Sequence, residues 1–435
     1  MTGTSGTEEP AALGGEPGSA QLPGPAPLSG GEPAAASATG LRGPLQPRAL
    51  ALAILAMAVG SFAIGTTEFA TMGLLPRIAD DVGATIPQAG YLVSAYALGV
   101  VVGAPLIVLS LPRAPRTTML LGLAVALAVG NALSALSPTL TTALGARFLA
   151  GLPHGAYFGI TAVVAASISP PQRRARSVAM VMMGLTVATM FGVPVSTWMG
   201  QVLGWRSLYW LVTVIALVSL VAIWRWVPQV PARAGATARR ELTALRSGQL
   251  WLAVAIGSIG FGGMFAVYSY ITPTMVAAGI AERHVPWVLL LWGAGMTLGT
   301  VLSGRLADRT MFGAIFTGLV GMAVTLAVFS VAATGPVTAV ALALLVAVAS
   351  QFIGPALQTR LLDVSREGPS LGAALNHSAL NIGNALGAWV GGAVLAAGYG
   401  FRAPAWAGAL LAVAGLAVAL VSYALERRTA ARSQA

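Results

Sequence analysis

Long apolar runs follow one another through most of this chain, from about residue 49 to about residue 425, with short polar breaks between them. A helix that crosses the hydrocarbon core of a bilayer needs about 20 mostly apolar residues. The runs therefore predict an all-α membrane protein whose 12 transmembrane helices lie near residues 50–73, 88–110, 117–137, 141–168, 177–202, 207–228, 250–273, 286–305, 312–333, 336–360, 371–395 and 403–424.

The composition supports a lipid environment. Hydrophobic residues make up 56% of the chain and charged residues only 9%, whereas charged residues make up about 25% of soluble globular domains. The chain contains no cysteine, which excludes disulfide bonds and thiolate metal sites. Its formal net charge of +11 would also fit a nucleic-acid-binding protein, so the positions of the basic residues have to decide.

All basic residues are arginines, and they are distributed unevenly among the predicted loops. With a cytoplasmic N-terminus, 18 of the 24 lie on the cytoplasmic side and four on the outside, at Arg77, Arg206, Arg283 and Arg402. This bias follows the positive-inside rule. It predicts a multi-pass protein of the cytoplasmic (inner) membrane with both termini in the cytoplasm, and it argues against nucleic acid as a partner.

We divide the chain into five segments. Residues 1–47 are rich in Gly, Pro, Ala and Ser and lack apolar periodicity, so we expect a disordered cytoplasmic tail. Residues 48–228 and 250–425 supply six helices each. Residues 229–249 form a basic cytoplasmic loop between these halves, and residues 426–435 form a cytoplasmic C-terminal tail.

The two halves resemble each other in sequence. The second helix of each half contains a Gly-x3-Gly pair, at Gly99 and Gly103 and at Gly295 and Gly299, and an arginine follows ten residues after the second glycine in both. Small residues four apart let two helix backbones approach closely. The matched spacing indicates an internal repeat, and parallel six-helix halves with a substrate site between them are a known transporter architecture.

The loop after the eighth predicted helix carries a motif. It reads Gly304-Arg-Leu-Ala-Asp308-Arg309 and resembles the loop signature of the major facilitator superfamily. In the first half, Pro112 occupies the place of Asp308, although Arg113 and Arg116 survive. If the usual carboxylate helps to lock the halves by charge pairing, the resemblance implies that this lock is weaker here. The loop motifs and Gly103, which precedes the first of them, are expected to take part in gating.

The fifth helix resembles the motif typical of drug/proton antiporters in that superfamily, and its members are Gly184, Gly192, Pro194 and Gly200. We expect these residues to be close-packing positions that seal the two halves together when the inside is open. With residues 67–76, 147–159 and 376–387, the motifs resemble the sugar- or arabinose-efflux branch of the twelve-helix antiporters, close to AraJ-type and chloramphenicol-exporter proteins.

Glu68 is the only acidic residue inside a predicted span. An ionised group in hydrocarbon costs at least about 2.5 kcal/mol, so such a residue is functional by default. A carboxyl that moves between low and high dielectric has an environment-dependent pKa, and we therefore expect Glu68 to carry a coupling proton. The alternative is a structural glutamate near the outer end of its helix.

Depth in the membrane suggests Arg147 as the partner of Glu68. Glu68 lies roughly 7 Å below the outer end of its helix, and Arg147 lies roughly 9 Å below the outer end of the fourth helix. Because both side chains share one layer, we expect them to form the proton-coupling pair, in contact directly or through water. The alternative is a structural arginine that satisfies backbone carbonyls.

Polar side chains on two helices predict a substrate cavity. His154 follows Arg147 by seven residues and projects from nearly the same helix face; it could relay protons, bind substrate or simply pack as a neutral histidine. His377, Asn381 and Asn384 form one polar stripe, which must face protein or a watery cavity. Interhelical hydrogen bonding is the alternative for this stripe. Further candidates for the cavity are Tyr157, Tyr268, Tyr270 and Gln351.

The sequence therefore predicts a secondary active transporter that exports a small molecule (a sugar, drug or antibiotic) by proton antiport with alternating access. Uptake or uncoupled facilitation in the same fold is the alternative, and the export direction comes from the resemblance alone. The substrate is left open by the residues.

A polytopic membrane enzyme or a sensor is the remaining class. The three histidines lie on separate elements, and the sequence shows no nucleophile–base pair, metal-ligand spacing or phosphate loop. We therefore expect no enzyme, no cofactor and no metal, with the proton as coupling ion. The expected partners are the lipid bilayer, the small-molecule substrate and protons, and the chain is expected to be a monomer.

Overall fold

The computed structural model describes residues 45–110, 113–231, 242–307, 309–365 and 369–434. In these ranges the regular secondary structure is helical. Twelve helical segments of this part of the chain are long and apolar enough to cross a membrane, which confirms the predicted all-α fold. The proposed tail up to residue 44 and most of the proposed central loop (232–241) lie outside the described residues, so the division into five segments stays an interpretation.

The first six spans comprise six continuous or near-continuous helices and one short helix. The first four spans are α1 (Pro47–Gly73), which is followed by the short α2 (Leu75–Asp81), α3 (Ile86–Ser110), α4 (Arg116–Leu136) and α5 (Leu140–Ser167). The fifth span is made of η1 (Pro171–Arg173), α6 (Arg174–Val187), η2 (Ala188–Gly192) and α7 (Val193–Leu203). The sixth span is α8 (Arg206–Trp226).

The last six spans follow after η3 (Thr243–Arg246). The seventh span is made of α10 (Gly248–Ala255), η4 (Ile256–Gly260) and α11 (Gly262–Tyr268), and the short α12 (Ile271–Ala277) and η5 (Glu282–His284) follow it. The eighth and ninth spans are α13 (Val285–Ala307) and α14 (Met311–Ala332). The tenth is made of α15 (Pro336–Ser350) and α16 (Gly354–Val364), and the last two are α17 (Pro369–Ala396) and α18 (Ala403–Gln434).

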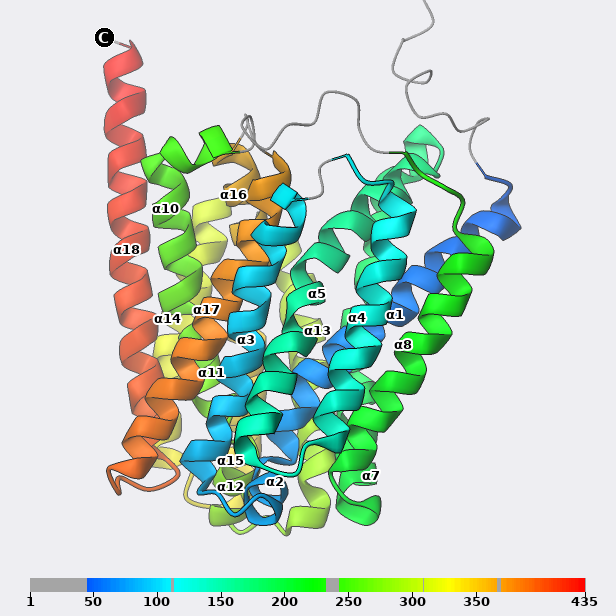
Figure 1. Cartoon of the computed structure of the whole chain (residues 1–435). Coiled ribbons are helices and arrows are strands. Elements are labelled where there is room, and N and C mark those ends of the chain that lie inside the picture. The colour runs from blue at the N-terminus through cyan, green and yellow to red at the C-terminus, as the bar shows by residue number, and fades with distance from the viewer. Residues whose placement is uncertain (1–44, 111–112, 232–241, 308, 366–368, 435) are drawn as a thin grey trace, which may run out of the picture. The chain divides into compact units, whose positions relative to one another are not determined.

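The spans run between two ends of the helical bundle (Figure 1). α1 begins and α18 ends at the same end, which we call the near end, and α2 and α12 lie at the opposite end, which we call the far end. The two sets of six spans meet where α3 packs along α17 (Figure 1) and where α13 packs against η2 and α7. These seams place α5 and α17 close enough for their polar side chains to meet.

The glycine pairs of the internal repeat have equivalent neighbours. A Cβ atom added at Gly99 or Gly103 of α3 would collide with carbonyl oxygens of α5, and one added at Gly295 or Gly299 of α13 would collide with α15 in the same way. Each pair therefore lets the second span of a set approach the fourth. This is the close backbone approach for which small residues four apart are suited.

Three spans depart from the single helices that the sequence predicts. The tenth span, expected as one helix over 336–360, is divided into α15 and α16. The seventh span, expected as one helix over 250–273, contains a π-helical turn (η4) and breaks between α11 and α12. The fifth span contains a second π-helical turn (η2). Such turns are found mostly as bulges inside α-helices and often near functional sites. In this chain η2 packs against α13, across the boundary between the two sets.

Burial in this structure is inverted relative to a soluble protein. Large apolar side chains such as Leu55, Val221 and Leu410 are exposed, while Glu68 and Arg147 are buried. Lipid tails can cover exposed apolar side chains, whereas polar groups inside the hydrocarbon need partners within the protein. The interior polar groups therefore locate the site.

Candidate functional site

A cluster of buried polar side chains lies where α1, α3, α5 and α17 meet. Glu68 Oε1 accepts a hydrogen bond from Asn384 Nδ2 at 3.4 Å, and Glu68 Oε2 lies 3.9 Å from His154 Nδ1. The same His154 nitrogen is 3.0 Å from the hydroxyl of Tyr96. Because α17 belongs to the last six spans and the other three helices to the first six, the cluster joins the two sets.

Glu68 is the only buried carboxylic acid among the described residues, with 6% of its surface exposed. Its two carboxyl oxygens face different sets of spans, Oε1 toward α17 and Oε2 toward α5. A buried charge has to be paired, hydrogen-bonded or neutralised by a proton. Gain or loss of a proton at Glu68 therefore changes contacts to both sets at once.

The polar stripe of α17 lies at this boundary. Asn384 reaches Glu68, and Asn381 donates from Nδ2 to the carbonyl oxygen of His377 at 3.1 Å. The ring of His377 stacks on Phe158 of α5 with centroids 5.1 Å apart and lies 5.7 Å from the ring of His154. His377 is partly exposed, whereas the two asparagines are buried.

Two amide oxygens of this stripe lack a hydrogen-bond partner. The Oδ1 atoms of Asn381 and Asn384 are buried and accept no hydrogen bond from the described residues. An unsatisfied buried acceptor costs about 1–3 kcal/mol. These oxygens are therefore available to a substrate or to water that enters between the two sets.

Arg147 binds the residue next to Glu68. Its guanidinium donates from Nη1 to Thr67 Oγ1 at 2.9 Å and from Nη2 to the Thr67 carbonyl oxygen at 3.2 Å. It also lies over the rings of Tyr96 and Tyr209, at 4.2 and 5.5 Å from their centroids. Arg147 thus lies at the level of Glu68, as its depth along the fourth helix predicts, but the hydrogen bonds that the structure describes go to Thr67 and not to the carboxylate.

Aromatic side chains cover the side of the cluster formed by the seventh span. Tyr268 of α11 contacts Phe69 of α1 edge-on, with ring centroids 5.6 Å apart, and tilts against Trp292 of α13 at 4.7 Å. Phe69 also stacks with Phe265 at 6.1 Å. Of the further cavity candidates, Tyr268 is therefore the one that lies beside Glu68.

The other candidates lie elsewhere, and Tyr270 donates to the carbonyl oxygen of Ala388 at 2.8 Å. Tyr157 donates to the carbonyl oxygen of Met57 at 3.0 Å and faces Ser219, so it joins α1, α5 and α8 inside the first six spans. Gln351 accepts from Thr300 at 3.4 Å within the last six spans. In the described contacts none of these side chains reaches the cluster around Glu68.

The predicted gating glycines of the fifth span pack against α1. A Cβ atom at Gly184, Gly192 or Gly200 would collide with α1 or with Leu74 after it. Pro194 is buried in the first turn of α7. The nearest neighbours of the three glycines thus lie within the first six spans, and the seal between the halves that was expected of them stays a prediction.

The loop motifs lie at the near end. Gly103 packs against Leu152 of α5, while Gly304 faces open space. Arg113 and Arg309 are exposed, and the backbone N–H of Arg116 donates to the carbonyl oxygen of Val230 at 2.8 Å. Asp308 and Pro112, on which the comparison of the two loops rests, lie outside the described residues.

Polar contacts that sequence reasoning missed join the two sets at the far end. Arg77 of α2 donates from Nε to Glu282 Oε1 at 2.6 Å and from Nη1 to the carbonyl oxygen of Gln201 at 2.8 Å. Gln201 Nε2 donates to the Glu282 carbonyl oxygen at 2.9 Å. Thr272 Oγ1 donates to the carbonyl oxygen of Gly73 at 2.7 Å. No feature of the sequence pairs these positions, because they are 80 or more residues apart.

Three buried residues of the site were also missed, namely Tyr96, Thr67 and Asn131. Thr67 and Asn131 are polar residues inside apolar runs, and intramembrane polar groups tend to be functional. That signal would have found both of them. Tyr96 gives no comparable signal, because tyrosine is common in apolar helices of many kinds.

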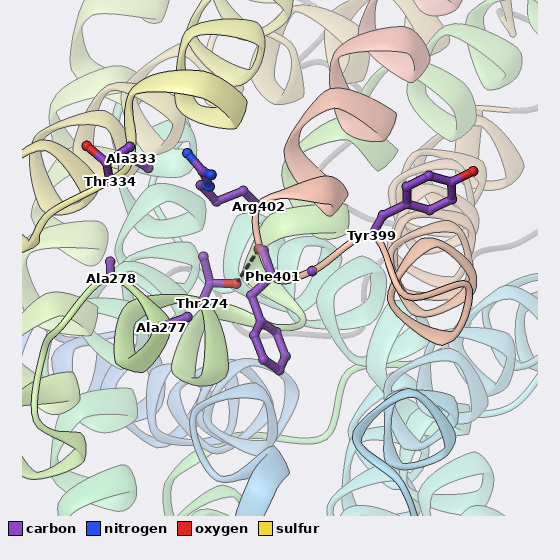
Figure 2. Close-up of a pocket in the computed structure, with 9 residues that line it drawn as sticks. Thr274, Ala277, Ala278, Ala333, Thr334, Tyr399, Phe401 and Arg402 are labelled. Carbon is purple, nitrogen blue, oxygen red and sulfur yellow. Dashed lines mark hydrogen bonds between the residues drawn. The ribbon is translucent and has the colours of Figure 1, made fainter.

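A pocket at the far end lies apart from this cluster. It lies between α12, the end of α14 and the loop before α18 (Figure 2). Its volume is about 280 Å³. Arg402 donates from Nη1 to the carbonyl oxygen of Val331 at 3.2 Å, and Thr274 donates to that of Phe401 at 3.2 Å. An arginine at the carbonyl end of a helix satisfies its free acceptors. We therefore interpret the pocket as part of a helix cap.

Known proteins similar to this chain are membrane transporters. The inner membrane transport protein YdhP of Escherichia coli (strain K12) is 41% identical over 370 residues, which cover 85% of this chain and 94% of that protein. A chloramphenicol resistance protein of Streptomyces lividans is 32% identical over 373 residues, covering 85% and 95%. Both matches span all but a small part of the relative.

The fold also matches solved structures. A bacterial homolog of the human lysosomal transporter Spinster, in an inward-facing and unoccupied conformation, superposes with a TM-score of 0.65 at 15% identity, covering 87% of this chain and 96% of that one. The model of the Major Facilitator Superfamily matches residues 57–376. This chain is a multi-pass membrane transport protein, and it belongs to the major facilitator superfamily.

Proposed function

We propose that this protein exports a small molecule by proton antiport and that Glu68 carries the proton. One observation carries the proposal: the only buried carboxylic acid of the described residues contacts both sets of spans, at Asn384 of α17 and His154 of α5. A ligand shifts a conformational equilibrium only by binding the two states with different affinity. A proton on Glu68 meets this condition if the contact with α17 changes when the two sets move.

His154 and Arg147 complete the proposed coupling site. The imidazole lies 3.9 Å from Glu68 Oε2, within reach of a small movement or of one water molecule. Arg147 places a fixed positive charge one residue away, at Thr67. Proton binding at Glu68 therefore changes the local field in which His154 and Arg147 lie.

The substrate is proposed to bind between the two sets, beside this site. The free amide oxygens of Asn381 and Asn384 would accept hydrogen bonds from it, and the rings of Tyr268 and His377 would pack against it. The resistance protein of Streptomyces lividans makes phenicols the first candidates to test. Sugars and lipophilic cations are the others.

We further propose that the near end faces the cytoplasm of a cell whose inner membrane holds the protein. The arginine distribution supports this orientation, and the name of the relative YdhP supports the membrane. The far-end contacts of Arg77 and Thr272 would then close the outward path in this structure. The protein is proposed to work as a monomer without a cofactor, in contact with lipid, protons and its substrate.

Inverted membrane vesicles with a respiration-driven pH gradient test the coupling. Phenicols, sugars and cationic dyes are added in turn, and the collapse of the gradient is followed for the native chain and for Glu68→Gln. Asp363→Asn, which removes an exposed carboxylate of α16, is the matched control. We expect one solute to collapse the gradient with the native chain and with the control, and Glu68→Gln to lose most of this effect.

Two results would contradict the proposal. Equal collapse with Glu68→Gln and the native chain would show that another group carries the proton. Passage of a solute through both forms without any effect on the gradient would show an uncoupled facilitator.

A further inference from the structure

A chain of directed hydrogen bonds runs from α4 through α1 to α5, directly beside Glu68. Asn131 Nδ2 donates to the carbonyl oxygen of Leu127 at 2.8 Å. Thr67 Oγ1 donates to Asn131 Oδ1 at 2.6 Å, and Arg147 Nη1 donates to Thr67 Oγ1 at 2.9 Å. Asn131 and Thr67 are fully buried, and Arg147 is 1% exposed.

The direction of each bond in this chain is fixed by the bond before it. Because the Asn131 amide nitrogen is bound to its own helix, the amide oxygen faces Thr67. A hydroxyl has one proton to donate and lone pairs to accept with. The Thr67 proton goes to Asn131, so a lone pair of Thr67 is presented to the guanidinium. Asn131 thus orients Thr67 as an acceptor for Arg147.

Arg147 has no anionic partner in this position. Among the described residues, no carboxylate oxygen lies within 4 Å of its guanidinium nitrogens. Its Nε is buried without a partner, and its charge is balanced by Thr67 and by the rings of Tyr96 and Tyr209. Removal of one acceptor from a buried charge is costly, because the charge is then left without compensation.

We propose that Thr67, oriented by Asn131, is a positioning residue that holds Arg147 against the backbone of α1 and so prevents an ion pair between Arg147 and Glu68. A direct ion pair would keep the carboxyl ionised and oppose proton binding. Held at Thr67, the guanidinium is near Glu68 but leaves its oxygens to Asn384 and His154. This inference rests on the proposed role of Glu68 as proton carrier.

Several elements around Glu68 present titratable or polar side chains. α5 presents Arg147 and His154, α3 presents Tyr96, and α11 presents Tyr268. α17 presents Asn384, with His377 two turns nearer the near end. Of these groups only Arg147 carries a fixed positive charge, so it is the one whose displacement would change proton binding most.

pH-difference infrared spectroscopy on the purified full-length chain tests the inference without a substrate. The carbonyl band of a protonated carboxyl reports proton binding, and the band of Glu68 is the one missing from Glu68→Gln. Thr67→Val removes the hydroxyl at nearly constant volume. We expect it to lower the pH at which this band is half-developed by about one unit or more, because Arg147 keeps only the Thr67 carbonyl oxygen as a hydrogen-bond acceptor and its free Nη1 turns toward Glu68.

Three controls separate positioning from general damage. Thr67→Ser keeps the hydroxyl and should restore the native titration. Thr66→Val makes the same change one residue away, at a hydroxyl that donates to the carbonyl oxygen of Phe62 at 2.8 Å, and should leave the titration unchanged. In an Arg147→Gln background, Thr67→Val should produce no further shift, as a double-mutant cycle requires for two residues that act as one unit.

The outcomes are distinguishable. A Thr67→Val titration that matches Thr66→Val, or a shift that persists without Arg147, would overturn the positioning role and leave Glu68 as carrier. If Glu68→Gln shows the same protonated-carboxyl bands as the native chain, the proposed function is contradicted, and the inference that rests on it is contradicted as well. If Thr67→Val does not fold, Asn131→Leu provides the second test. We expect Asn131→Leu to shift the titration in the same direction by a smaller amount. An unshifted titration in Asn131→Leu would overturn the inference.

Discussion

The first and seventh spans break at equivalent points and use the break differently. Pro76 lies in the first turn of α2, and Pro273 lies in the first turn of α12. Proline is tolerated there because the first turn of a helix leaves its N–H groups unbonded. When the two prolines are aligned, Glu68 corresponds to Phe265 and Gly73 corresponds to Tyr270. One span thus carries a carboxylate and a glycine where the other carries two aromatic rings.

The difference suits two tasks. Glu68 forms the polar contacts to α5 and α17, while the ring of Phe265 packs against the rings of Phe69 and Phe261. Tyr270 donates to the Ala388 carbonyl oxygen at 2.8 Å. Its ring fills the space left by glycines of α3 and α17, where an added Cβ would collide with it. The first span therefore supplies the carboxylate of the site, and the seventh supplies aromatic rings that fill the space beside it and at the far end.

The two breaks are also joined to each other. The hydroxyl of Thr272 in α12 donates to the carbonyl oxygen of Gly73, the last residue of α1. A Cβ atom at Gly73 would meet Thr197 of α7 and Leu289 of α13, so the glycine lets these two helices approach the end of α1. The two breaks thus share a similar backbone but carry different side chains, and the two breaks contact each other at the far end.

Removal of the Tyr270 side chain should have the largest effect on stability. Tyr270→Ala leaves a cavity between α3 and α17 and is expected to cost about 3 kcal/mol. Tyr270→Phe keeps the ring, loses only the bond to Ala388 and should cost about 1 kcal/mol. Thermal unfolding in detergent measures both. Equal losses for the two variants would show that the ring fills no space of consequence.

The corresponding change in the first span should act by crowding. Gly73→Ala places a Cβ atom against Thr197 and Leu289 and is expected to cost about 1–3 kcal/mol. The same unfolding assay measures this loss. Gly83→Ala cannot serve as the control, because Gly83 has a positive φ of 65° and any side chain there would strain the backbone. Gly122, where an added Cβ meets open space, is the matched site. A stabilised Gly73→Ala would break the contrast between a narrow first break and a filled seventh break.

The ion pair between the spans should affect far-end opening more than stability. Arg77 and Glu282 are 40% and 39% exposed, and exposed pairs contribute about 0–1 kcal/mol. Because the chain has no cysteine, a single cysteine at Ser94, which lies between α3 and α17, can report access. Arg77→Gln should increase its labelling by an impermeant thiol reagent up to about fivefold from the far side only.

The neighbouring ion pair of α2 should have the smallest effect. Asp81 accepts from Arg206 Nη1 at 2.6 Å and from Trp205 Nε1 at 3.1 Å, both within the first six spans. These bonds, that of Arg206 first, lower the pKa of Asp81 below its ordinary value of 3.8. A lowered pKa means that the contribution to stability is present above that value and is lost as the pH falls through the folded-state pKa.

Asp81→Asn should therefore reduce stability at neutral pH by roughly 0.5 kcal/mol or less, since solvent screens the pair. The difference from the native chain should vanish in acid once the pH falls below the folded-state pKa, and added salt should reduce it at neutral pH. Labelling at Ser94 should not change, because this pair does not join the two sets. Faster labelling in Asp81→Asn would remove the distinction between the two pairs of α2.

Sequence reasoning located the spans well because its signal is local. Twenty apolar residues can be counted in any window, and the arginine bias sums over loops without knowledge of the fold. The lone Glu68 in an apolar run was found for the same reason. The breaks and π-helical turns of the fifth and seventh spans were missed, because glycine and proline patterns also occur in continuous membrane helices.

Partners across the chain were beyond the sequence. Arg147 was placed in the right layer because rise per residue fixes depth, but azimuth around the helix and the neighbouring helix are set by packing. Only the tertiary structure could turn its guanidinium to Thr67 and not to Glu68, and only it could bring Asn384, 316 residues away, to the carboxyl.

The sequence by itself therefore determined the solvent, the number of spans, the repeat and the presence of one intramembrane acid, since each depends on composition or on spacing along one helix. The tertiary structure decided which groups share that acid and which residues join the two sets at the far end. It did so because hydrogen bonds depend on distances of about 3 Å and on direction, and these are fixed only when helices far apart in sequence pack together.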